Sequence, residues 1–230
     1  MKTLGLLGGL SWVSTADYYR IINRTINERK GGNEAARIVL YSVNFGEFIP
    51  AFDERWWQDA AKRFTDIARK LESAGAEGFL FCANTPHKVA DEVRAAINIP
   101  LIHIAEVTAS AIQARKLRTV ALLGTRFTME EEFFRNKLSA ADIHAIIPDQ
   151  GDREFIHGTI FGDLSKGIVT PANKERYLRI VDVLAKRGAE GVILGCTEIP
   201  LVVKPEDIAL PLFDTTQLHA TAAVDFALGD

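Results

Sequence analysis

Short runs of continuously apolar residues recur along the chain and predict buried strands. The runs lie at 3–9, 37–45, 78–82, 99–104, 119–124, 143–148, 191–195 and 210–215. A strand that is covered on both faces carries apolar side chains at successive positions, whereas a half-exposed strand alternates apolar with polar residues. The pattern therefore predicts parallel sheets with helices on both sides.

Helical patterns of apolar and polar positions fill the intervals between these runs. They cover residues 11–30, 59–78, 127–138 and 174–191, and the second and fourth of them end in a glycine stop just before a strand. Strands that alternate with helices are typical of α/β proteins, in which the strands of a sheet run parallel. We therefore expect an α/β fold.

Two of the expected helices carry N-cap signals. Ser14 is followed three residues later by Asp17, and Thr128 is followed three residues later by Glu131. A hydroxyl with an acidic side chain three residues further on is the spacing found at the start of many helices. We therefore expect Ser14 and Thr128 to be N-caps, a role that explains Thr128 without a ligand.

Three segments of the first half recur in the second half in the same order. TLGLLGG at 3 resembles TVALLGT at 119, GAEGFLFCANT at 75 resembles GAEGVILGCTE at 188, and INIPLIHI at 97 resembles IALPLFDT at 208. The offsets of 116, 113 and 111 residues are nearly equal, which favours a duplicated half over chance similarity. We expect two pseudo-symmetric lobes, 1–105 plus 212–230 and 106–211, each with a roughly four-stranded parallel sheet flanked by helices. Strand-end loops would then line a site between the lobes.

The repeat also aligns the two cysteines one residue out of register. Cys82 falls on Gly195, and Ala83 falls on Cys196. Because side chains alternate between the two faces of a strand, a shift of one residue changes the face. We expect Cys82 to be a small buried hydrophobe. Cys196 precedes a strand-end loop whose backbone N–H groups can favour a thiolate, so we expect it to be the reactive cysteine.

The composition excludes several other classes of protein. The net charge of −3 gives no attraction to nucleic acid or to an anionic membrane. The apolar run at 4–10 is too short to cross a bilayer and makes a poor signal peptide, so a cytoplasmic location is expected. The two cysteines form no disulfide framework, no Cys/His cluster has metal-ligand spacing, and GLLGGL lacks the GxGxxG spacing of a dinucleotide site.

Six motifs that span nearly the whole chain resemble those of one enzyme superfamily. They are GLLGGLSWVST (5–15), CANTPHKVAD (82–91), IPLIHIAE (99–106), ALLGTRFTMEEEFF (121–134), GCTEIPLVV (195–203) and PLFDTTQLHATAAV (211–224). They resemble the aspartate/glutamate racemase superfamily, and in particular its broad-specificity or acidic amino-acid branch. The resemblance implies two pseudo-symmetric lobes, often in a homodimer, that act on an amino acid or related carboxylate without pyridoxal phosphate or another cofactor.

The mechanism that the resemblance implies uses two cysteines on opposite sides of the substrate α-carbon. Cys196 matches one of them, but Ala83 stands where most members carry the other. A displaced Cys82 could serve instead, or water or His87 could protonate the second face. Alternatively, two-base chemistry is lost, as in the arylmalonate decarboxylase branch, which keeps only the second-half cysteine. A catalytically silent amino-acid-binding relative is a further alternative.

Polar residues gather in the strand-end loops and are candidates to bind the substrate carboxylate and stabilise a carbanion. They are Ser11, Ser14, Thr15, Asn84, Thr85, Thr125 and Thr197. Any one of them could be a helix cap or a turn residue, but together they occupy matching loops of the repeat. Two cations, Arg55 in FDERWWQD (52–59) and Lys166 in LSKGIVT, could hold a side-chain carboxylate, although ordinary surface positions explain both.

Several further residues have both a structural and a functional interpretation. Glu198 could orient a base or pair with an arginine, and Arg126 could contact a carboxylate or form an ordinary surface ion pair. His87 could reach the site or bond to a backbone carbonyl, and His219 fits a structural role on a closing helix. Of the adjacent Trp56 and Trp57, at least one is expected away from the core, because both cannot face it.

Overall fold

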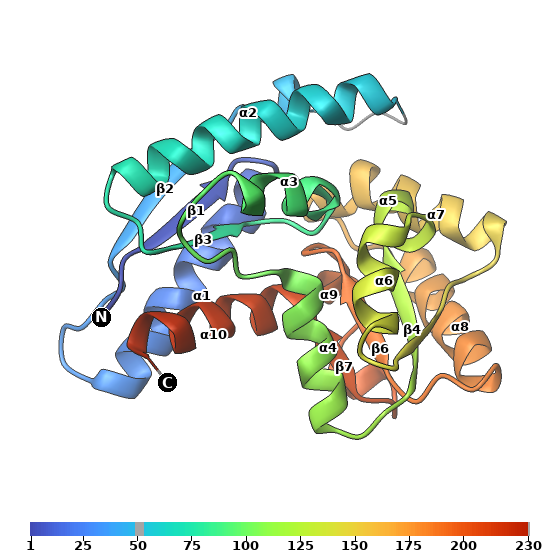
Figure 1. The fold of residues 1–230 in the computed structure, drawn as a ribbon. Coiled ribbons are helices and arrows are strands. Elements are labelled where there is room, and N and C mark those ends of the chain that lie inside the picture. Colours follow the sequence, from blue (N-terminus) through green and yellow to red (C-terminus); the bar gives the residue numbers. More distant parts are fainter. Residues whose placement is uncertain (49–52, 230) are drawn as a thin grey trace. The chain divides into compact units, whose positions relative to one another are not determined.

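The computed structural model describes residues 1–48 and 53–229 and divides into two compact units. Unit 1 comprises Met1–His103 and His219–Asp230, and unit 2 comprises Ile104–Leu218 (Figure 1). The chain therefore leaves unit 1 after His103 and returns to it at His219. In the part of the chain that the structure describes, no helix combines the length and the apolar character needed to cross a bilayer.

Unit 1 contains a parallel sheet of three strands in the order β2-β1-β3. Its elements are β1 (Leu4–Gly8), α1 (Trp12–Lys30), β2 (Ile38–Ser42), the 3-10 helix η1 (Phe45–Glu47), α2 (Glu54–Ser73), β3 (Gly78–Phe81), the 3-10 helix η2 (Thr85–Val89) and α3 (Ala90–Ala95). The strand expected over 99–104 is reduced to a single bridge between Phe79 and Leu101. It is short because helix α4 already begins at Ile104.

Unit 2 contains a parallel sheet of four strands in the order β5-β4-β6-β7. Its elements are α4 (Ile104–Ala114), β4 (Thr119–Gly124), α5 (Arg126–Glu130), α6 (Glu132–Ser139), β5 (His144–Ile146), α7 (Gln150–Gly162), η3 (Leu164–Lys166), α8 (Pro171–Lys186), β6 (Val192–Gly195), α9 (Ile199–Val202), η4 (Pro205–Asp207) and β7 (Leu212–Asp214). Helix α10 (Thr215–Leu228) begins in unit 2 and continues into unit 1. The two units repeat one strand order, which confirms the expected pair of similar α/β lobes.

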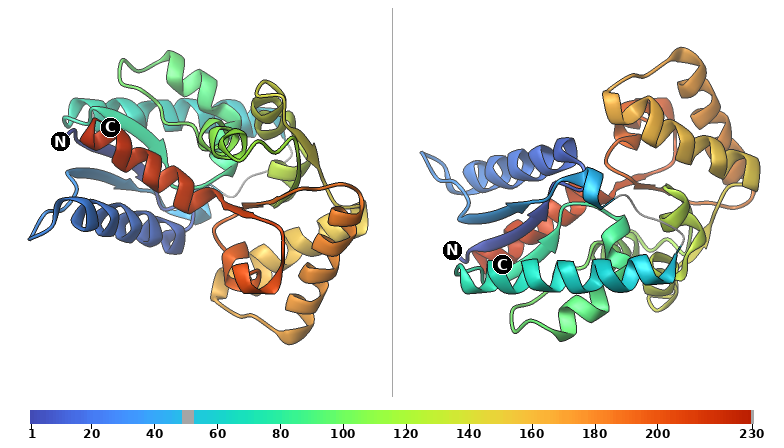
Figure 2. Two further views of the ribbon diagram at one scale, coloured as in Figure 1. Left: turned by 90° about the horizontal axis from the view of Figure 1, so that it is seen from below. Right: turned by 90° about the horizontal axis from the view of Figure 1, so that it is seen from above.

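Helices cover both faces of each sheet at its central strands, as the continuously apolar runs predict. The edge strand β2 differs from this expectation, because Leu40 and Tyr41 are 42% and 39% exposed. In unit 1, Leu6 and Leu80 pack with α1 and α10 on one face. Helix α2 runs along the other face (Figure 2). There the rings of Phe81 and of Phe64 in α2 lie edge to face, with centroids 5.5 Å apart. In unit 2, α7 and α8 cover the face that carries Leu123, whereas α4 and α6 cover the opposite face.

Strand pairing follows the same register in both units. Leu7 pairs with Phe81 in unit 1, and the corresponding pair in unit 2 is Leu123 with Leu194. When both pairings are continued past the strand ends, Cys82 takes the register position of Gly195. Ala83 takes the register position of Cys196. The alignment of the sequence repeat is thus also an alignment of the two sheets.

The first helix after each leading strand is capped three residues earlier than expected. Ser11 is the N-cap of α1 and accepts a hydrogen bond from Ser14 N at 3.3 Å. Thr125 is the N-cap of α5 and accepts one from Thr128 N at 3.3 Å. The expected caps Ser14 and Thr128 are therefore wrong, because each occupies the helical position whose N–H the true cap binds. The helix expected over 127–138 is two helices that meet at an extended Glu131.

Close packing of α5 on the strand ends of unit 2 requires glycine at two neighbouring positions. Gly124 and Gly195 are partners in the β4–β6 pairing. A Cβ on Gly124 would lie 2.9 Å from the Gly195 carbonyl oxygen and 3.1 Å from the Thr128 side chain. A Cβ on Gly195 would lie 2.7 Å from the Leu123 carbonyl oxygen. The glycines therefore let α5 approach the ends of β4 and β6.

We predict that Gly124→Ala destabilises the protein by about 1–3 kcal/mol, since the added methyl group meets backbone that cannot move aside. The matched control is Gly158→Ala in α7, where a Cβ meets nothing within 4 Å. That change should be neutral or stabilise by up to about 1 kcal/mol, because alanine favours the helix. Urea unfolding followed by circular dichroism measures both, and equal stability of the two variants would contradict the packing explanation.

Candidate functional site

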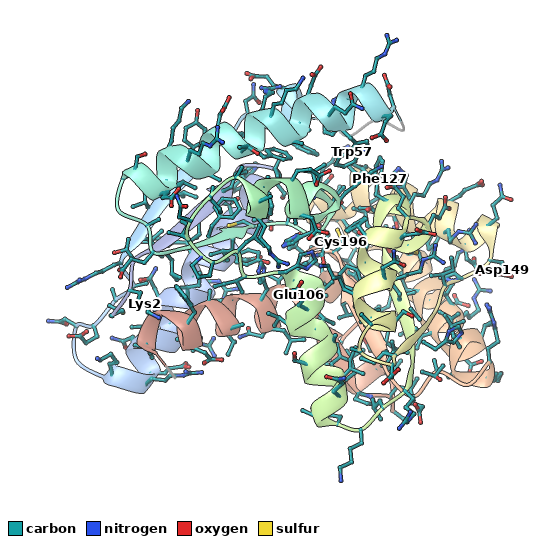
Figure 3. All side chains as sticks on the ribbon, in the orientation of Figure 1. Lys2, Trp57, Glu106, Phe127, Asp149 and Cys196 are labelled. Atoms are coloured by element: carbon teal, nitrogen blue, oxygen red, sulfur yellow. The ribbon has the colours of Figure 1, made fainter. Side chains whose placement is uncertain are left out.

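The polar segment that follows β6 lies at the carboxyl edge of the unit 2 sheet. Strand β6 ends at Gly195, and Cys196, Thr197 and Glu198 follow before α9 begins (Cys196 is labelled in Figure 3). Since Gly124 and Gly195 are paired in parallel strands, the next residue of each strand, Thr125 and Cys196, leaves the sheet at the same edge. Loops at this edge are where open α/β sheets bind ligands.

A buried carboxylate organises this segment. The Cys196 thiol donates a hydrogen bond to Glu198 Oε2 at 2.9 Å, and the Thr197 hydroxyl donates to the same oxygen at 2.7 Å. Glu198 is only 7% exposed, whereas Cys196 is half-buried. The carboxylate therefore fixes the direction of both side chains.

The Cys196–Glu198 pair holds the thiol in its protonated form. Burial raises the pKa of Cys196 well above its usual value, and the Glu198 charge and its hydrogen bond to the thiol raise it further. Backbone N–H groups of Thr197 and Glu198 act in the opposite direction but do not outweigh these effects. The expectation that this loop favours a thiolate is therefore wrong at rest, because the carboxylate two residues away repels a second negative charge.

A neutral phenol lies near this pair in unit 2. Tyr177 of α8 belongs to the core cluster on which Cys196 packs, and its hydroxyl lies 2.9 Å from Thr159 Oγ1. Burial raises the pKa of Tyr177, and the nearby Glu198 charge raises it further. The phenol thus stays uncharged and adds no positive charge that could stabilise a thiolate.

In unit 1 the first cysteine belongs to the packed core. Cys82 is 1% exposed and lies in a cluster with Leu6, Tyr18 and Leu80. Burial raises the pKa of the Cys82 thiol far above its usual range. The next residue, Ala83, is half-buried. The strand end of unit 1 therefore places a methyl group, and not a thiol, at the register position of Cys196.

Three of the predicted binding hydroxyls in unit 1 form bonds that hold their own loop. Ser11 caps α1, and Ser14 donates its hydroxyl proton to the Cys82 carbonyl oxygen. Thr15 Oγ1 accepts from Gly9 N at 2.8 Å and donates to the Ser11 carbonyl at 2.9 Å. Gly9 has a φ of +85°, and a Cβ there would lie 2.1 Å from the Val43 carbonyl oxygen. Ser11 and Thr15 therefore stabilise a tight glycine turn, whereas Ser14 ties helix α1 to the end of β3.

The other predicted binding residues divide between the two units. In unit 1, Asn84 is 5% exposed and Thr85 is half-buried at the start of η2. In unit 2, Thr125 caps α5 and is buried, and Thr197 is bonded to Glu198. Each unit thus contributes two polar side chains at the carboxyl ends of its strands.

The predicted cations lie at exposed positions. Arg55 is exposed in the first turn of α2, and its backbone N–H donates to Asp53 Oδ1 at 3.0 Å. Lys166 is exposed at the end of η3. Of the adjacent tryptophans, Trp57 is 2% exposed and Trp56 is half-buried, while Phe52 of the same motif lies outside the described residues.

An ion-pair network that the sequence did not reveal surrounds the start of α5 in unit 2. Arg126 Nε lies 3.6 Å from Glu130 Oε2, and Arg153 Nε donates to the other oxygen of Glu130 at 2.8 Å. The Arg126 backbone N–H donates to His157 Nδ1 at 3.3 Å. The i,i+4 spacing of Arg126 and Glu130 in the sequence indicates that these two residues can form an ion pair on a helix.

Metal ligands are not grouped in either unit. Within 1–48 and 53–229, no three histidine, cysteine or carboxylate side chains lie close enough together to hold a metal ion.

Comparison with known proteins gives consistent results. Residues 7–223 match the family model described as Asp/Glu/hydantoin racemase. A candidate Asp/Glu racemase from Yersinia pestis is 44% identical, with a TM-score of 0.94 over 99% of this chain and 100% of that one. An aspartate racemase homologue from Pyrococcus horikoshii is 34% identical, with a TM-score of 0.86 over 99% and 100% of the two chains. A glutamate racemase from Koribacter versatilis is 30% identical over 195 residues, which are 78% of this chain and 66% of that protein.

We predict that Glu198→Gln lowers the pKa of Cys196, because the change removes the negative charge that opposes the thiolate. The pKa should stay above its usual value even so, because burial of the thiol still raises it. Alkylation of Cys196 by iodoacetamide, followed by mass spectrometry across a pH series, should therefore begin at lower pH in the variant.

The matched control is Glu190→Gln, which changes the same side chain at the other end of β6. Glu190 accepts from Arg118 N at 2.8 Å and from Thr119 N at 2.9 Å, and a glutamine can still accept these bonds. Its pH profile for Cys196 should match that of the unmodified protein. An unchanged profile in Glu198→Gln would show that the carboxylate does not control the thiol.

Proposed function

The chain belongs to the Asp/Glu/hydantoin racemase family, and from that premise we propose that it removes and returns the α-proton of an amino acid without a cofactor. Racemases of this kind are isomerases. The observation that carries the proposal is the half-buried Cys196 thiol, held by the buried Glu198 carboxylate at a strand-end edge. A thiol and a carboxylate in contact can exchange a proton between them, which an acid/base catalyst requires.

In the proposed first step, Cys196 passes its proton to Glu198 and the thiolate then takes the α-proton. The net charge of the pair is unchanged, because the thiol and carboxylate become a thiolate and a carboxylic acid. The transfer is uphill, because burial and the Glu198 charge hold the pKa of Cys196 well above its usual value. Glu198 is then the group that makes Cys196 a base.

The resulting carbanion needs hydrogen-bond donors at the α-carboxylate, because no cofactor withdraws its charge. We propose Asn84, Thr85, Thr125 and Thr197 for this contact. Ser11, Ser14 and Thr15 contribute less directly, since their hydroxyls are bonded to the backbone of unit 1. The relatives named above are described as a glutamate racemase, a candidate Asp/Glu racemase and an aspartate racemase homologue, so acidic amino acids are the first substrates to test. Arg55 and Lys166 are the proposed partners of the side-chain carboxylate.

The position of Ala83 favours a second candidate function. A methyl group has no proton to give, and the neighbouring Cys82 thiol is buried among apolar side chains. Water is then the remaining proton source for the second face of the carbanion. A single protonated thiol also suits one-sided chemistry, such as decarboxylation of a small disubstituted malonate followed by protonation on one face. A catalytically silent amino-acid-binding relative is the third possibility.

Two expectations stay predictions. They are the homodimer that the family resemblance implies and the cytoplasmic location that the sequence indicates. Light scattering coupled to size-exclusion chromatography measures the first.

We predict that the protein incorporates deuterium from D₂O at Cα of a substrate amino acid and that Cys196→Ala abolishes this exchange. Loss of an acid/base group typically lowers the rate by about 10²–10⁴-fold. Proton NMR over a panel of D- and L-amino acids, beginning with aspartate and glutamate, measures the exchange. Cys82→Ala is the control, because it removes the buried thiol, and it should retain the activity. Exchange that survives in Cys196→Ala would contradict the proposal.

We predict that Ala83→Cys raises the rate of racemisation, because it supplies a second acid/base group at the position that is equivalent to Cys196 in the repeat. Ala83→Thr should give a smaller increase, since a hydroxyl is a weaker acid than a thiol. Chiral chromatography of the product measures both variants. If both fold and still bind amino acids without any gain in turnover, the silent-relative alternative is favoured. Carbon dioxide release from a disubstituted malonate, with a single product enantiomer, would favour the decarboxylase alternative.

A further inference from the structure

Unit 1 contains three buried histidines in contact with one another. His87, His103 and His219 are each at most 2% exposed. The ring centroid of His87 lies 4.7 Å from that of His103 and 5.5 Å from that of His219. His103 and His219 stand at the two points where the chain leaves and re-enters unit 1. His87 lies in η2, directly after the loop that carries Ala83 and Asn84.

The hydrogen bonds of two of these rings fix their protonation. His87 Nδ1 lies 3.0 Å from the Ala83 carbonyl oxygen and 3.1 Å from the Asn84 carbonyl oxygen, and both can only accept. Nδ1 of His87 must therefore carry a hydrogen. His219 Nε2 lies 2.8 Å from the Ile102 carbonyl oxygen, so it donates there and accepts from the Tyr18 hydroxyl at Nδ1, 2.8 Å away.

His87 and His219 stay neutral at physiological pH. Burial lowers the pKa of His87 well below its usual value, and the neighbouring His103 and His219 lower it further. Burial lowers the pKa of His219 to about 4. The other groups near this turn are the Tyr18 phenol and Lys88, whose ammonium lies 4.6 Å from the centre of the Trp57 ring. His87 therefore acts as a fixed hydrogen-bond donor, and not as a proton carrier.

We propose that His87 is a positioning residue, whose Nδ1–H holds the two peptide groups after Ala83 and after Asn84 in one orientation. This inference rests on the proposed function. A peptide group is planar, so fixing its carbonyl also fixes the backbone on either side of it. The direction of the side chains at Ala83 and Asn84 follows from that backbone. These are the register counterpart of Cys196 and a proposed carboxylate ligand.

Packing alone does not explain a histidine at this position. The His87 ring lies edge to face against Phe81, with centroids 5.2 Å apart, and an apolar side chain could make a similar contact. Burying an imidazole costs free energy unless its polar atoms are bonded. Here the bonded atom serves the loop carbonyls, and the other two histidines pack on the ring without competing for them.

The test distinguishes the effect of the His87 Nδ1–H donor from the effect of losing the imidazole ring. In His87→Asn the side-chain amide nitrogen takes the place of Nδ1 and keeps its N–H, whereas His87→Leu fills the space without a donor. Both variants lose the ring, so both should lose similar stability. His144→Asn in β5 is the matched control, because His144 is exposed and belongs to unit 2.

Two readouts are compared well below the unfolding temperature. At saturating substrate, kcat for exchange at Cα should fall at least tenfold in His87→Leu and recover to within about threefold of the unmodified protein in His87→Asn. Amide hydrogen exchange of the peptide covering 82–89 should accelerate in His87→Leu and stay protected in His87→Asn. His144→Asn should change neither.

Equal loop protection in the leucine and asparagine variants would overturn the positioning role. The positioning role would also be overturned if kcat fell by the same factor in His87→Leu and His87→Asn, in proportion to the loss of stability. If the unmodified protein exchanges no amino acid, the proposed function fails, but the amide measurement still decides whether His87 holds the loop.

Discussion

The register of parallel pairing between the first and third strands of each unit is the constraint on which the site depends. In both units this register determines which residue of the third strand is the last to lie in the sheet and which is the first to lie in the loop at the carboxyl edge. Side chains alternate along a strand, so a shift of one residue exchanges a core position for a loop position. This constraint places Cys82 in the core and Cys196 at the edge, although both cysteines stand in nearly the same sequence.

The repeated backbone therefore carries different chemistry in its two halves. The loop of unit 2 holds a thiol, a hydroxyl and a carboxylate in one hydrogen-bonded group. The matching loop of unit 1 holds Ala83, and its buried hydroxyls and His87 bond to the backbone. The loop of unit 2 thus carries groups that can transfer a proton, whereas the side chains at the loop of unit 1 fix the conformation of the backbone. This difference is the basis of the proposal that Cys196 alone supplies acid/base chemistry.

Much of this arrangement could be predicted from the sequence, because it follows from local patterns. The apolar runs located the strands, and the repeat predicted the shared register. The predictions failed where several local choices compete. Ser11 and Ser14 are both hydroxyls near one helix start, and the apolar run at 99–104 is cut short by α4. The protonated Cys196 and the histidine cluster depend on side-chain directions and on residues far apart in sequence, which no pattern records.

The central claim is that a single acid/base thiol serves one face of the α-carbon. The most direct test starts from each pure enantiomer of the substrate in D₂O. The quantity measured is the ratio of α-deuteration to inversion in the first few per cent of reaction. We predict that one enantiomer exchanges its α-proton many times for each inversion, while the other exchanges slowly, because only one face meets the thiol of Cys196. Equal exchange of both enantiomers, with inversion at every event, would contradict the account.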